Sequence, residues 1–374
     1  MPEAETASIE PIPGRIVSVD VLRGFDMFWI VGGEGFFAAL FKFFGPGIQK
    51  PLVRQLHHSH WVGFRFYDLI FPLFVFVVGM SVVFSLEKIL AQKGKKAAYR
   101  RIFRRFVILY LLGIFYYQGI QNGIENIRLL GVLQRLAITY LFAAIFFIHL
   151  NRKAMLAVLV AILIGYWAWL SFVPVPGLHE VSFAEGKNWA NWVDAHYLPF
   201  RKWNGTWDPE GLLSTIPAIA SALLGVFAAL IIRSRNIEPM RKVTIFVGGG
   251  IAMVVVGLLW GLQFPIIKKI WTSSYVLVAG GYSALLLGIF YLIVDVWKMQ
   301  KWAVPFVWIG MNPITIYMAR NIVSFDSLAK RVVGGELLTV FGEPVGIFLV
   351  KTVSLGFSLW LVHFLFKKKV FLKI

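Results

Sequence analysis

The stretch DLIFPLFVFVVGMSVVFSLEKILAQKGKKAAYRRIFRR, residues 68–105, decides the fold class of this chain. Its first half contains Ile70–Leu86, 17 consecutive residues without a charge. A run of that length is long enough to cross about 30 Å of hydrocarbon as a helix. Its second half carries eight lysine and arginine residues. An apolar run followed by a basic connector is typical of a membrane helix that ends at the cytoplasmic surface.

Similar apolar runs recur along all 374 residues, of which 58% are hydrophobic and 15% charged, with a mean hydropathy of +0.73. A soluble domain keeps about a quarter of its residues charged, and its helices show polar faces that these runs lack. The sequence therefore predicts an all-α polytopic membrane protein of about ten transmembrane helices. The predicted spans are 19–44, 65–87, 105–121, 130–150, 154–174, 212–232, 243–262, 274–296, 303–319 and 344–366.

The connectors between these spans alternate in character. One set is basic and, by the positive-inside rule, cytoplasmic. The other set is less basic and is predicted to lie outside, and an even number of spans places both chain ends in the cytoplasm. The basic residues assigned to the cytoplasmic side are Lys88, Lys93, Lys95, Lys96, Arg100, Arg101, Arg104, Arg105, Arg152, Lys153, Arg233, Arg235, Arg241, Lys242, Lys298, Lys301, Lys367, Lys368, Lys369 and Lys373. The outer connectors are 45–64, 122–129, 175–211, 263–273 and 320–343.

The domain organisation follows from this topology. Residues 1–14 are predicted to form a cytoplasmic tail, and residues 15–374 a single transmembrane domain. Its outer segment 175–211, which contains NWANWVDAHYLPFRKWNGTWDPEG, is long enough to cap a site. Its aromatic side chains suit either stacking on a sugar or anchoring at the membrane interface, and the sequence leaves both open.

Two other classes of function are excluded by composition. The net charge of +18 is scattered over short connectors rather than gathered in one domain, which argues against nucleic-acid binding. The chain has no cysteine, so disulfides, thiol catalysis and thiolate metal sites are excluded.

The first span contains Asp20, Arg23, Asp26 and Glu34, and each is a functional candidate because charge within a membrane is costly. Asp20 and Arg23, three residues apart, are predicted to pair near the cytoplasmic end. Glu34 lies deeper, and its spacing of eight from Asp26 predicts one shared helix face. The alternative is an ion-pair network that only fixes the order of the helices.

Three further polar residues fall in later spans. Asp68 opens the second span and Arg135 lies near the start of the fourth, where it is a predicted partner for Asp68 or Glu34. Asn312 lies midway along the ninth span.

The outer segment before the second span holds His57, His58 and His60. Their spacing differs from the i, i+4 pattern of helical metal ligands and no acidic set completes a shell, so we predict no metal site. A histidine near a carboxylate is better suited to act as a general base.

Five blocks of this chain resemble the heparan-alpha-glucosaminide N-acetyltransferase family of transmembrane acyltransferases. The S-x-D-x-x-R-G opening is similar to RIVSVDVLRG, and the K-H-A-x-W-N-G-x-x-x-x-D-L-x-F-P signature is similar to the segment that starts at His57. Three more blocks follow in the family's order, which are GVLQRLAITY from Gly131, WDPEGLLSTIPAI from Trp207 and IGMNPITIY from Ile309.

This resemblance implies an enzyme that binds acetyl-CoA from the cytoplasm and transfers the acetyl group to a sugar on the far side of the membrane. The family's active-site histidine falls on His58, and His57 takes the place of the preceding lysine. The family's active-site asparagine falls on Glu34, so an amide is replaced by a carboxylate. The resemblance points to a bacterial homologue in the cytoplasmic (inner) membrane, and we expect a homodimer.

Amide formation from a thioester needs a base and donors to the developing oxyanion. We predict His58 as the base, with Glu34 or Asp68 orienting or polarising it. Asp20 and Arg23 are predicted at the cofactor, and Arg135 and Asn312 as donors there. The basic connectors supply cations for the CoA phosphates. Direct transfer and an acetyl-His58 relay both remain open, as do N- and O-acetylation and the acceptor.

A proton- or ion-coupled transporter is the alternative from another class, with buried acidic residues and Arg135 as a relay. Such a transporter is expected to show matched broken helices in two halves, and the sequence shows none.

Overall fold

The computed structural model describes residues 16–335 and 342–371 and is all-helical, apart from one isolated bridge between Val62 and Ile267. The predicted tail 1–14 and Lys373 lie outside the described residues. Within the described ranges, eight helices are long and apolar enough to cross a membrane. The chain is therefore a polytopic membrane protein, as predicted. These helices span Val17–Phe43, Phe66–Tyr116, Val132–His149, Arg152–Phe172, Leu212–Arg233, Pro239–Gly261, Ser273–Val296 and Glu343–Lys367.

The connector between the predicted spans 65–87 and 105–121 is helical on both sides of Gly94. Helix α4 runs from Ile70 to Tyr116 and leaves helical geometry only at Gly94, where φ is 72°. The intervening residues are mostly lysine, arginine, alanine and glutamine, which favour helix. Arg105 Nη1 donates to Ser81 Oγ at 3.2 Å, although a straight helix would separate these residues by roughly 36 Å. The chain therefore turns back at Gly94, and the division into spans 65–87 and 105–121 stays a prediction.

The predicted span 303–319 is divided rather than continuous. Helix α11, Val304–Met311, ends at Asn312, and α12, Pro313–Ile322, begins directly after it. Asn312 has φ −130° and ψ 43°, outside helical geometry. A residue before proline is disfavoured in the α region, so Pro313 explains the break. A single helix over 303–319 is wrong for this physical reason.

The structure divides into two compact units, and each is described here by itself. The first unit consists of three segments, which are the residues up to His58, residues Arg65–Ile70 and the residues from Leu286 onward. The second unit takes Ser59–Phe64 and Phe71–Leu285. The single domain over 15–374 stays a prediction.

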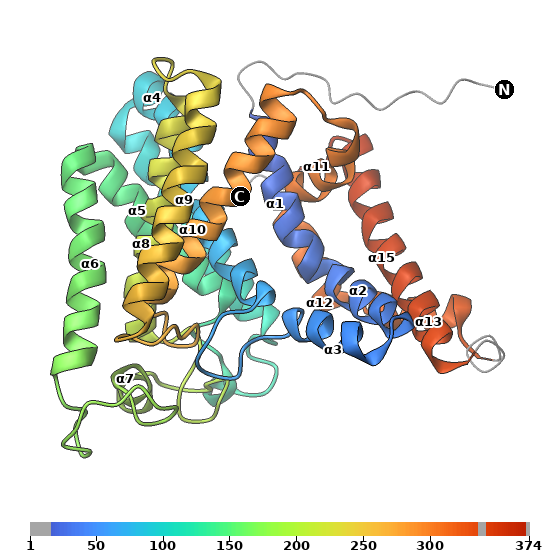
Figure 1. Cartoon of the computed structure of the whole chain (residues 1–374), viewed down its shortest axis with the longest axis horizontal. Helices are drawn as coiled ribbons and strands as arrows, with labels where there is room; N and C mark the ends of the chain where they lie inside the picture. The colour runs from blue at the N-terminus through green and yellow to red at the C-terminus, as the bar shows by residue number, and fades with distance from the viewer. Residues whose placement is uncertain (1–15, 336–341, 372–374) are drawn as a thin grey trace. The chain divides into compact units, whose positions relative to one another are not determined.

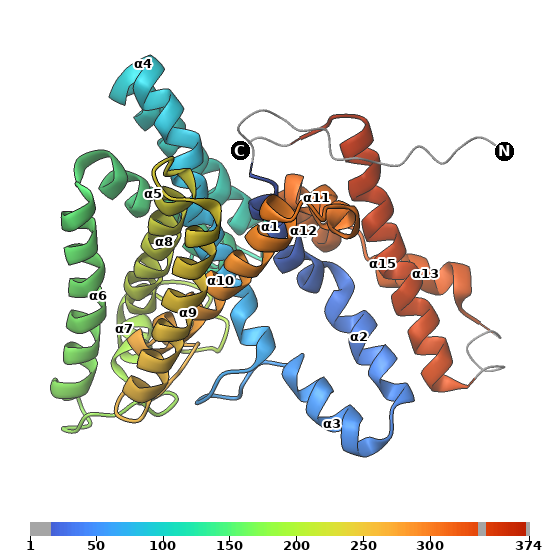
Figure 2. The same cartoon turned by 45° about the horizontal axis from the view of Figure 1, so that its top comes forward.

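In the first unit, α1 (Val17–Phe28) lies against α11, and α15 (Glu343–Lys367) lies against α2, α11 and α13 (Figure 1). Helix α2 (Glu34–Leu40) continues the first span, and α13 is Phe325–Val333. Helix α3 (Pro46–Gln55) then turns back from α2, and Figure 2 shows the two diverging from their connection.

In the second unit, α8 (Leu212–Arg233) is the central helix. It contacts α5 (Val132–His149), α6 (Arg152–Phe172) and α7 (Trp189–Tyr197), as well as α9 (Pro239–Gly261). Helix α10, Ser273–Phe290, completes the row of long helices in Figure 1. Close packing of α8 on α4 depends on small residues, since a Cβ on Gly79 would lie 1.9 Å from the Ala222 carbonyl oxygen.

The predicted outer segment 175–211 is not only a loop. It contains α7, which begins after Asn188, whose side chain accepts a hydrogen bond from the Asn191 amide. Asparagine in this position is a strong helix start signal.

Candidate active site

The centre of the candidate site is a hydrogen bond between His58 and Asp68. His58 follows the end of α3 by three residues, and Asp68 lies in a 3₁₀ turn, Phe66–Leu69, that leads into α4. Imidazole Nδ1 lies 2.9 Å from carboxylate Oδ1. The Asp68 side chain is fully buried, whereas that of His58 is 51% exposed. The imidazole therefore has one side fixed by the protein and remains accessible to a reactant.

The neighbouring residues hold Asp68 in place. The Arg65 amide donates to Asp68 Oδ2 at 3.0 Å, and the Arg65 guanidinium donates to the His58 carbonyl oxygen at 2.8 Å. The Tyr67 ring lies against the His58 ring with centroids 4.9 Å apart. The amide of Phe66 donates to Gln55 Oε1 at 3.0 Å, which joins the end of α3 to this turn.

This arrangement determines the chemistry available to His58. An ionised carboxylate only accepts hydrogen bonds, so we assign the hydrogen of the neutral ring to Nδ1. Nε2 then carries the lone pair that accepts a proton, as in a general base oriented by a carboxylate. The structure thus brings together His58 and Asp68 of the predicted set.

His57 and His60 are both exposed. Across residues 16–335 and 342–371, no group of three histidine, aspartate or glutamate side chains is placed to hold a metal ion.

The predicted pair of Asp20 and Arg23 is confirmed. Arg23 Nη1 lies 3.4 Å from Asp20 Oδ1 and donates to the Gly310 carbonyl oxygen at 3.3 Å. Contact between α1 and α11 is close here, because a Cβ on Gly310 would lie 2.0 Å from the Asp20 carbonyl oxygen. Asn312 follows two residues later at the α11–α12 break, so it belongs to the same unit. Binding of a cofactor by these residues stays a prediction.

The first span is interrupted just before Glu34. Residues Trp29–Gly33 form a π-helical turn in which Gly32 has φ 137°, and half-buried Glu34 begins α2. The shared face of Asp26 and Glu34 assumed an unbroken α-helix, and that assumption is wrong. Interruptions of this kind are frequent at functional sites.

Buried polar atoms gather on this part of α1. Asp26 is fully buried, and neither of its carboxylate oxygens has a hydrogen-bond partner among the described residues. Trp29 Nε1, one turn further along, also has no hydrogen-bond partner among the described residues. The Trp29 ring lies 4.8 Å from that of Phe66, in the turn that carries Asp68. Unpartnered polar groups at this depth are costly and mark a functional region.

Arg135 lies in the second unit. Its Nη2 donates to the Pro209 carbonyl oxygen at 3.0 Å and to Ser214 Oγ at 2.5 Å, and its guanidinium lies 4.8 Å from the Trp271 ring centroid. Pairing with Asp68 or Glu34 stays a prediction.

A buried ionic cluster beside Arg135 was missed by the sequence reasoning. Arg128 donates to both Asp208 oxygens at 2.8 and 2.6 Å and to Glu210 at 2.6 Å. Its guanidinium also packs on the rings of Tyr117 and Trp203. The signal was present as charged residues near the C-terminal ends of two connectors, in IRLLGVLQR for 122–129 and in WDPEG for 175–211.

Burial sets the protonation behaviour of this cluster. Desolvation raises the pKa of Glu210, and it raises the pKa of Asp194 to about 6 even though the amides of Leu212 and Asp208 donate to that carboxylate. Burial alone would lower the pKa of Arg128, but the hydrogen bond to Asp208 and the charge of Glu210 raise it. The cluster fastens the end of segment 175–211 to the connector before α5.

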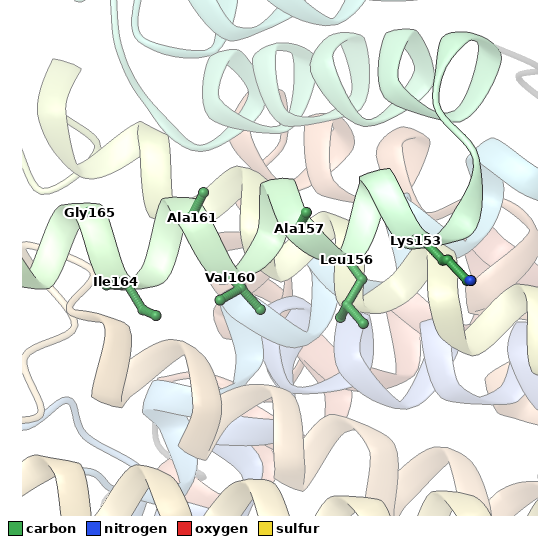
Figure 3. A pocket seen from close by; sticks show the side chains of 7 residues that line it. All are labelled: Lys153, Leu156, Ala157, Val160, Ala161, Ile164 and Gly165. Atoms are coloured by element: carbon green, nitrogen blue, oxygen red, sulfur yellow. The ribbon is translucent and has the colours of Figure 1, made fainter.

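The hollow along α6 is not a candidate site. Figure 3 shows that its lining residues, from Lys153 to Gly165, all belong to this one helix. They are apolar apart from Lys153. A largely apolar face of one membrane-spanning helix is the surface expected against lipid.

Comparison with models of known protein families finds no match. Heparan-alpha-glucosaminide N-acetyltransferase of Homo sapiens is 27% identical to this chain over 375 residues, covering 85% of this chain and 54% of the human protein. The Mus musculus protein of the same name is 28% identical over 324 residues, covering 71% and 49% of the two chains. The chain thus spans about half the length of the curated relatives it matches. The chain is thus a distant homologue of the heparan-alpha-glucosaminide N-acetyltransferases.

Proposed function

We propose that this protein is an acetyltransferase that moves an acetyl group from cytoplasmic acetyl-CoA to an amine on the opposite side of the membrane. The observation that carries the proposal is the His58–Asp68 hydrogen bond of 2.9 Å, with Asp68 buried and His58 half exposed. Distant homology to a membrane N-acetyltransferase family supports this class of reaction. The acceptor we propose is an amino sugar.

In the proposed reaction the acceptor amine attacks the thioester carbonyl carbon, while His58 Nε2 removes a proton from the amine. A nitrogen–carbon bond forms and the carbon–sulfur bond breaks, and the sulfur leaves as the thiol once it has gained a proton. Asp68 stabilises the imidazolium that forms. A relay through acetyl-His58 uses the same residues and remains open.

The cofactor region is proposed at the α1–α11 contact. Arg23 there supplies a cation suited to the CoA phosphates. Asn312 and Arg135 are proposed as donors to the thioester carbonyl or the acceptor. The basic connectors also support a cytoplasmic entry for the cofactor and cytoplasmic chain ends. A bacterial cytoplasmic membrane and a homodimer are proposed on the resemblance alone.

The function is tested by incubating the purified protein with radiolabelled acetyl-CoA and a panel of amino sugars. We expect label in an amide product with wild type and none with His58→Ala. His57→Ala is the matched control, because His57 is a neighbouring exposed histidine, and it should keep most of the activity. Absence of transfer to every amine, together with no stabilisation of the protein by millimolar acetyl-CoA, would contradict the proposal.

An ion-coupled transporter is the second candidate, and the structure supplies an observation that favours it. Contrary to the sequence analysis, the structure shows broken helices, at Trp29–Gly33 and at Asn312, and Asp26 lies buried near the first break. Both breaks belong to one unit, however, whereas α5, α6, α8 and α9 of the other are continuous. Transporters built from repeats place such breaks in corresponding positions of two halves.

A further inference from the structure

Helix α3 is a ten-residue helix with no buried residue. Isolated helices of this length are marginal in water, so α3 needs a surface to lie on. Four large apolar side chains in and just before it are exposed, namely Phe43 by 50%, Phe44 by 45%, Ile48 by 57% and Leu52 by 38%. Phe43 ends the candidate membrane-spanning segment Val17–Phe43 and the other three residues follow it, so α3 begins at a membrane surface.

Apolar and basic side chains lie on different sides of α3. At roughly 100° per residue, Ile48 and Leu52 share one flank. The exposed cations Lys50 and Arg54 lie roughly 120–160° away from that flank. Gln49 and Val53 of this helix are half-buried. An apolar flank opposed to a basic one is the pattern of a helix that lies in the plane of a membrane interface.

The catalytic histidine lies at the end of this helix. Only Leu56 and His57 separate Gln55 from His58, and a chain of three residues spans about 11 Å at most. The hydrogen bond from the Phe66 amide to Gln55 Oε1 also fixes the end of α3 to the turn that carries Asp68. A helix lying among lipid headgroups therefore places the half-exposed imidazole at the depth of those headgroups.

We propose that α3 is seated in the leaflet facing the acceptor, and that the acceptor amine is carried on a membrane lipid. The class we infer is an amino sugar joined to lipid through phosphate, because Lys50 and Arg54 attract phosphate at the membrane surface. This inference rests on the proposed function and names the class of its acceptor.

The seating of α3 is tested first, without reference to activity. The chain has no cysteine, so single cysteines at Ile48 and Lys50 can carry an environment-sensitive fluorophore in vesicles of phosphatidylcholine and phosphatidylglycerol. We expect spin-labelled lipids to quench the probe at position 48 strongly and the probe at position 50 weakly. Equal, weak quenching at both positions would overturn the inference. So would a shielded probe at 48 that lipids do not quench, which is the result if a second copy covers α3.

The acceptor class is then tested with one sugar in two forms, hexadecyl glucosaminide in the vesicles and methyl glucosaminide in solution. Wild type is expected to acetylate the lipid-borne form at least about tenfold faster at equal bulk concentration. An equal or greater rate with the soluble form overturns the inference and leaves the acetyltransferase intact. Transfer to neither form nor to any other amine overturns the proposed function, and the inference falls with it.

A pair of variants separates docking from folding. Ile48→Glu with Leu52→Glu should abolish the preference for the lipid-borne acceptor while transfer to the soluble form persists. The matched control is Leu328→Glu with Val332→Glu on α13, another short helix of this unit with exposed apolar residues four apart. This control should keep the preference. If both pairs lose it equally, the effect is not specific to α3 and the inference is wrong.

Discussion

The fixed tautomer of His58 is the main feature at the scale of single residues. Asp68 is fully buried, receives the Arg65 amide on one oxygen and faces His58 Nδ1 with the other. Both of its carboxylate oxygens are therefore engaged, and of the two residues that the sequence left open, Glu34 and Asp68, we propose Asp68 for the orienting role. Glu34 is left for another task in the proposed reaction.

Asp68→Asn should lower the turnover of acetyl transfer by about 10²–10⁴-fold. The amide can donate to Nδ1, which stabilises the tautomer whose Nε2 carries the hydrogen and cannot take a proton. Initial rates with labelled acetyl-CoA measure the effect. Stabilisation of the variant by acetyl-CoA should stay near that of wild type, and an unchanged turnover would refute the orienting role of Asp68.

Glu34→Gln should raise the KM for the acceptor more than it lowers kcat. Glu34 begins α2 after the break in the first span, and in the resembling family the corresponding position is an amide. Steady-state kinetics with varied acceptor separate the two parameters. A large fall in kcat with a shifted pH optimum would instead assign Glu34 to tuning His58.

At the scale of elements, the contact between α1 and α11 depends on the absence of side chains. A Cβ on Gly310 would lie 2.0 Å from the Asp20 carbonyl oxygen, and one on Gly24 would lie 1.7 Å from that of Phe306. The backbone atoms concerned cannot rotate away, so the helices themselves would have to separate.

Gly310→Ala should lower the thermal stability of the protein in detergent and weaken its stabilisation by acetyl-CoA. The physical reason is that separating α1 from α11 also removes the hydrogen bond from Arg23 to the Gly310 carbonyl. The overpacking itself costs about 1–3 kcal/mol or more. Gly356→Ala on α15 is the control, since a Cβ there meets nothing within 4 Å. Equal behaviour of the two variants would argue against the close contact.

The pKa of Asp194 predicts a pH-dependent attachment of the outer segment. Burial raises this pKa from 3.8 to about 6, so the folded state favours the neutral acid. The resulting stability is full below the unfolded pKa and is lost as the pH rises through about 6, up to about 3 kcal/mol in total. The melting temperature should therefore fall more between pH 5 and pH 7 for wild type than for Asp194→Asn. An identical pH dependence in both proteins would be the contrary result.

Sequence patterns predicted the elements whose signals are local. The long apolar runs and the Asp20–Arg23 pair were found because spacing alone determines them. The break at Trp29–Gly33 was missed because two glycines inside an apolar run are compatible with both a continuous and an interrupted helix. The break at Asn312 could have been predicted from Pro313. The Arg128–Asp208 pair joins residues 80 apart, and no local pattern predicts such a contact. The His58–Asp68 pair was suggested by residue type, and only the structure supplied its distance.

The whole molecule combines basic connectors that are predicted to be cytoplasmic with a candidate site in a connector that is predicted to lie outside. The net charge of +18 is concentrated in the connectors predicted to be cytoplasmic, which suits a polyanionic cofactor on that side. His58 lies in the connector 45–64, which is predicted to lie outside. If the cofactor binds on one side and the proposed base lies on the other, the acetyl group has to cross the membrane within the protein.

Transfer across a sealed bilayer is the measurement that tests this claim most directly. Proteoliposomes of wild type and of His58→Ala would hold the acceptor amine inside, with radiolabelled acetyl-CoA added outside. The account predicts labelled acetylated acceptor trapped within wild-type vesicles, formed by the molecules whose basic connectors face outward, and none within those of His58→Ala. Product that forms only when acceptor and acetyl-CoA share a compartment, or equal product with His58→Ala, would contradict it.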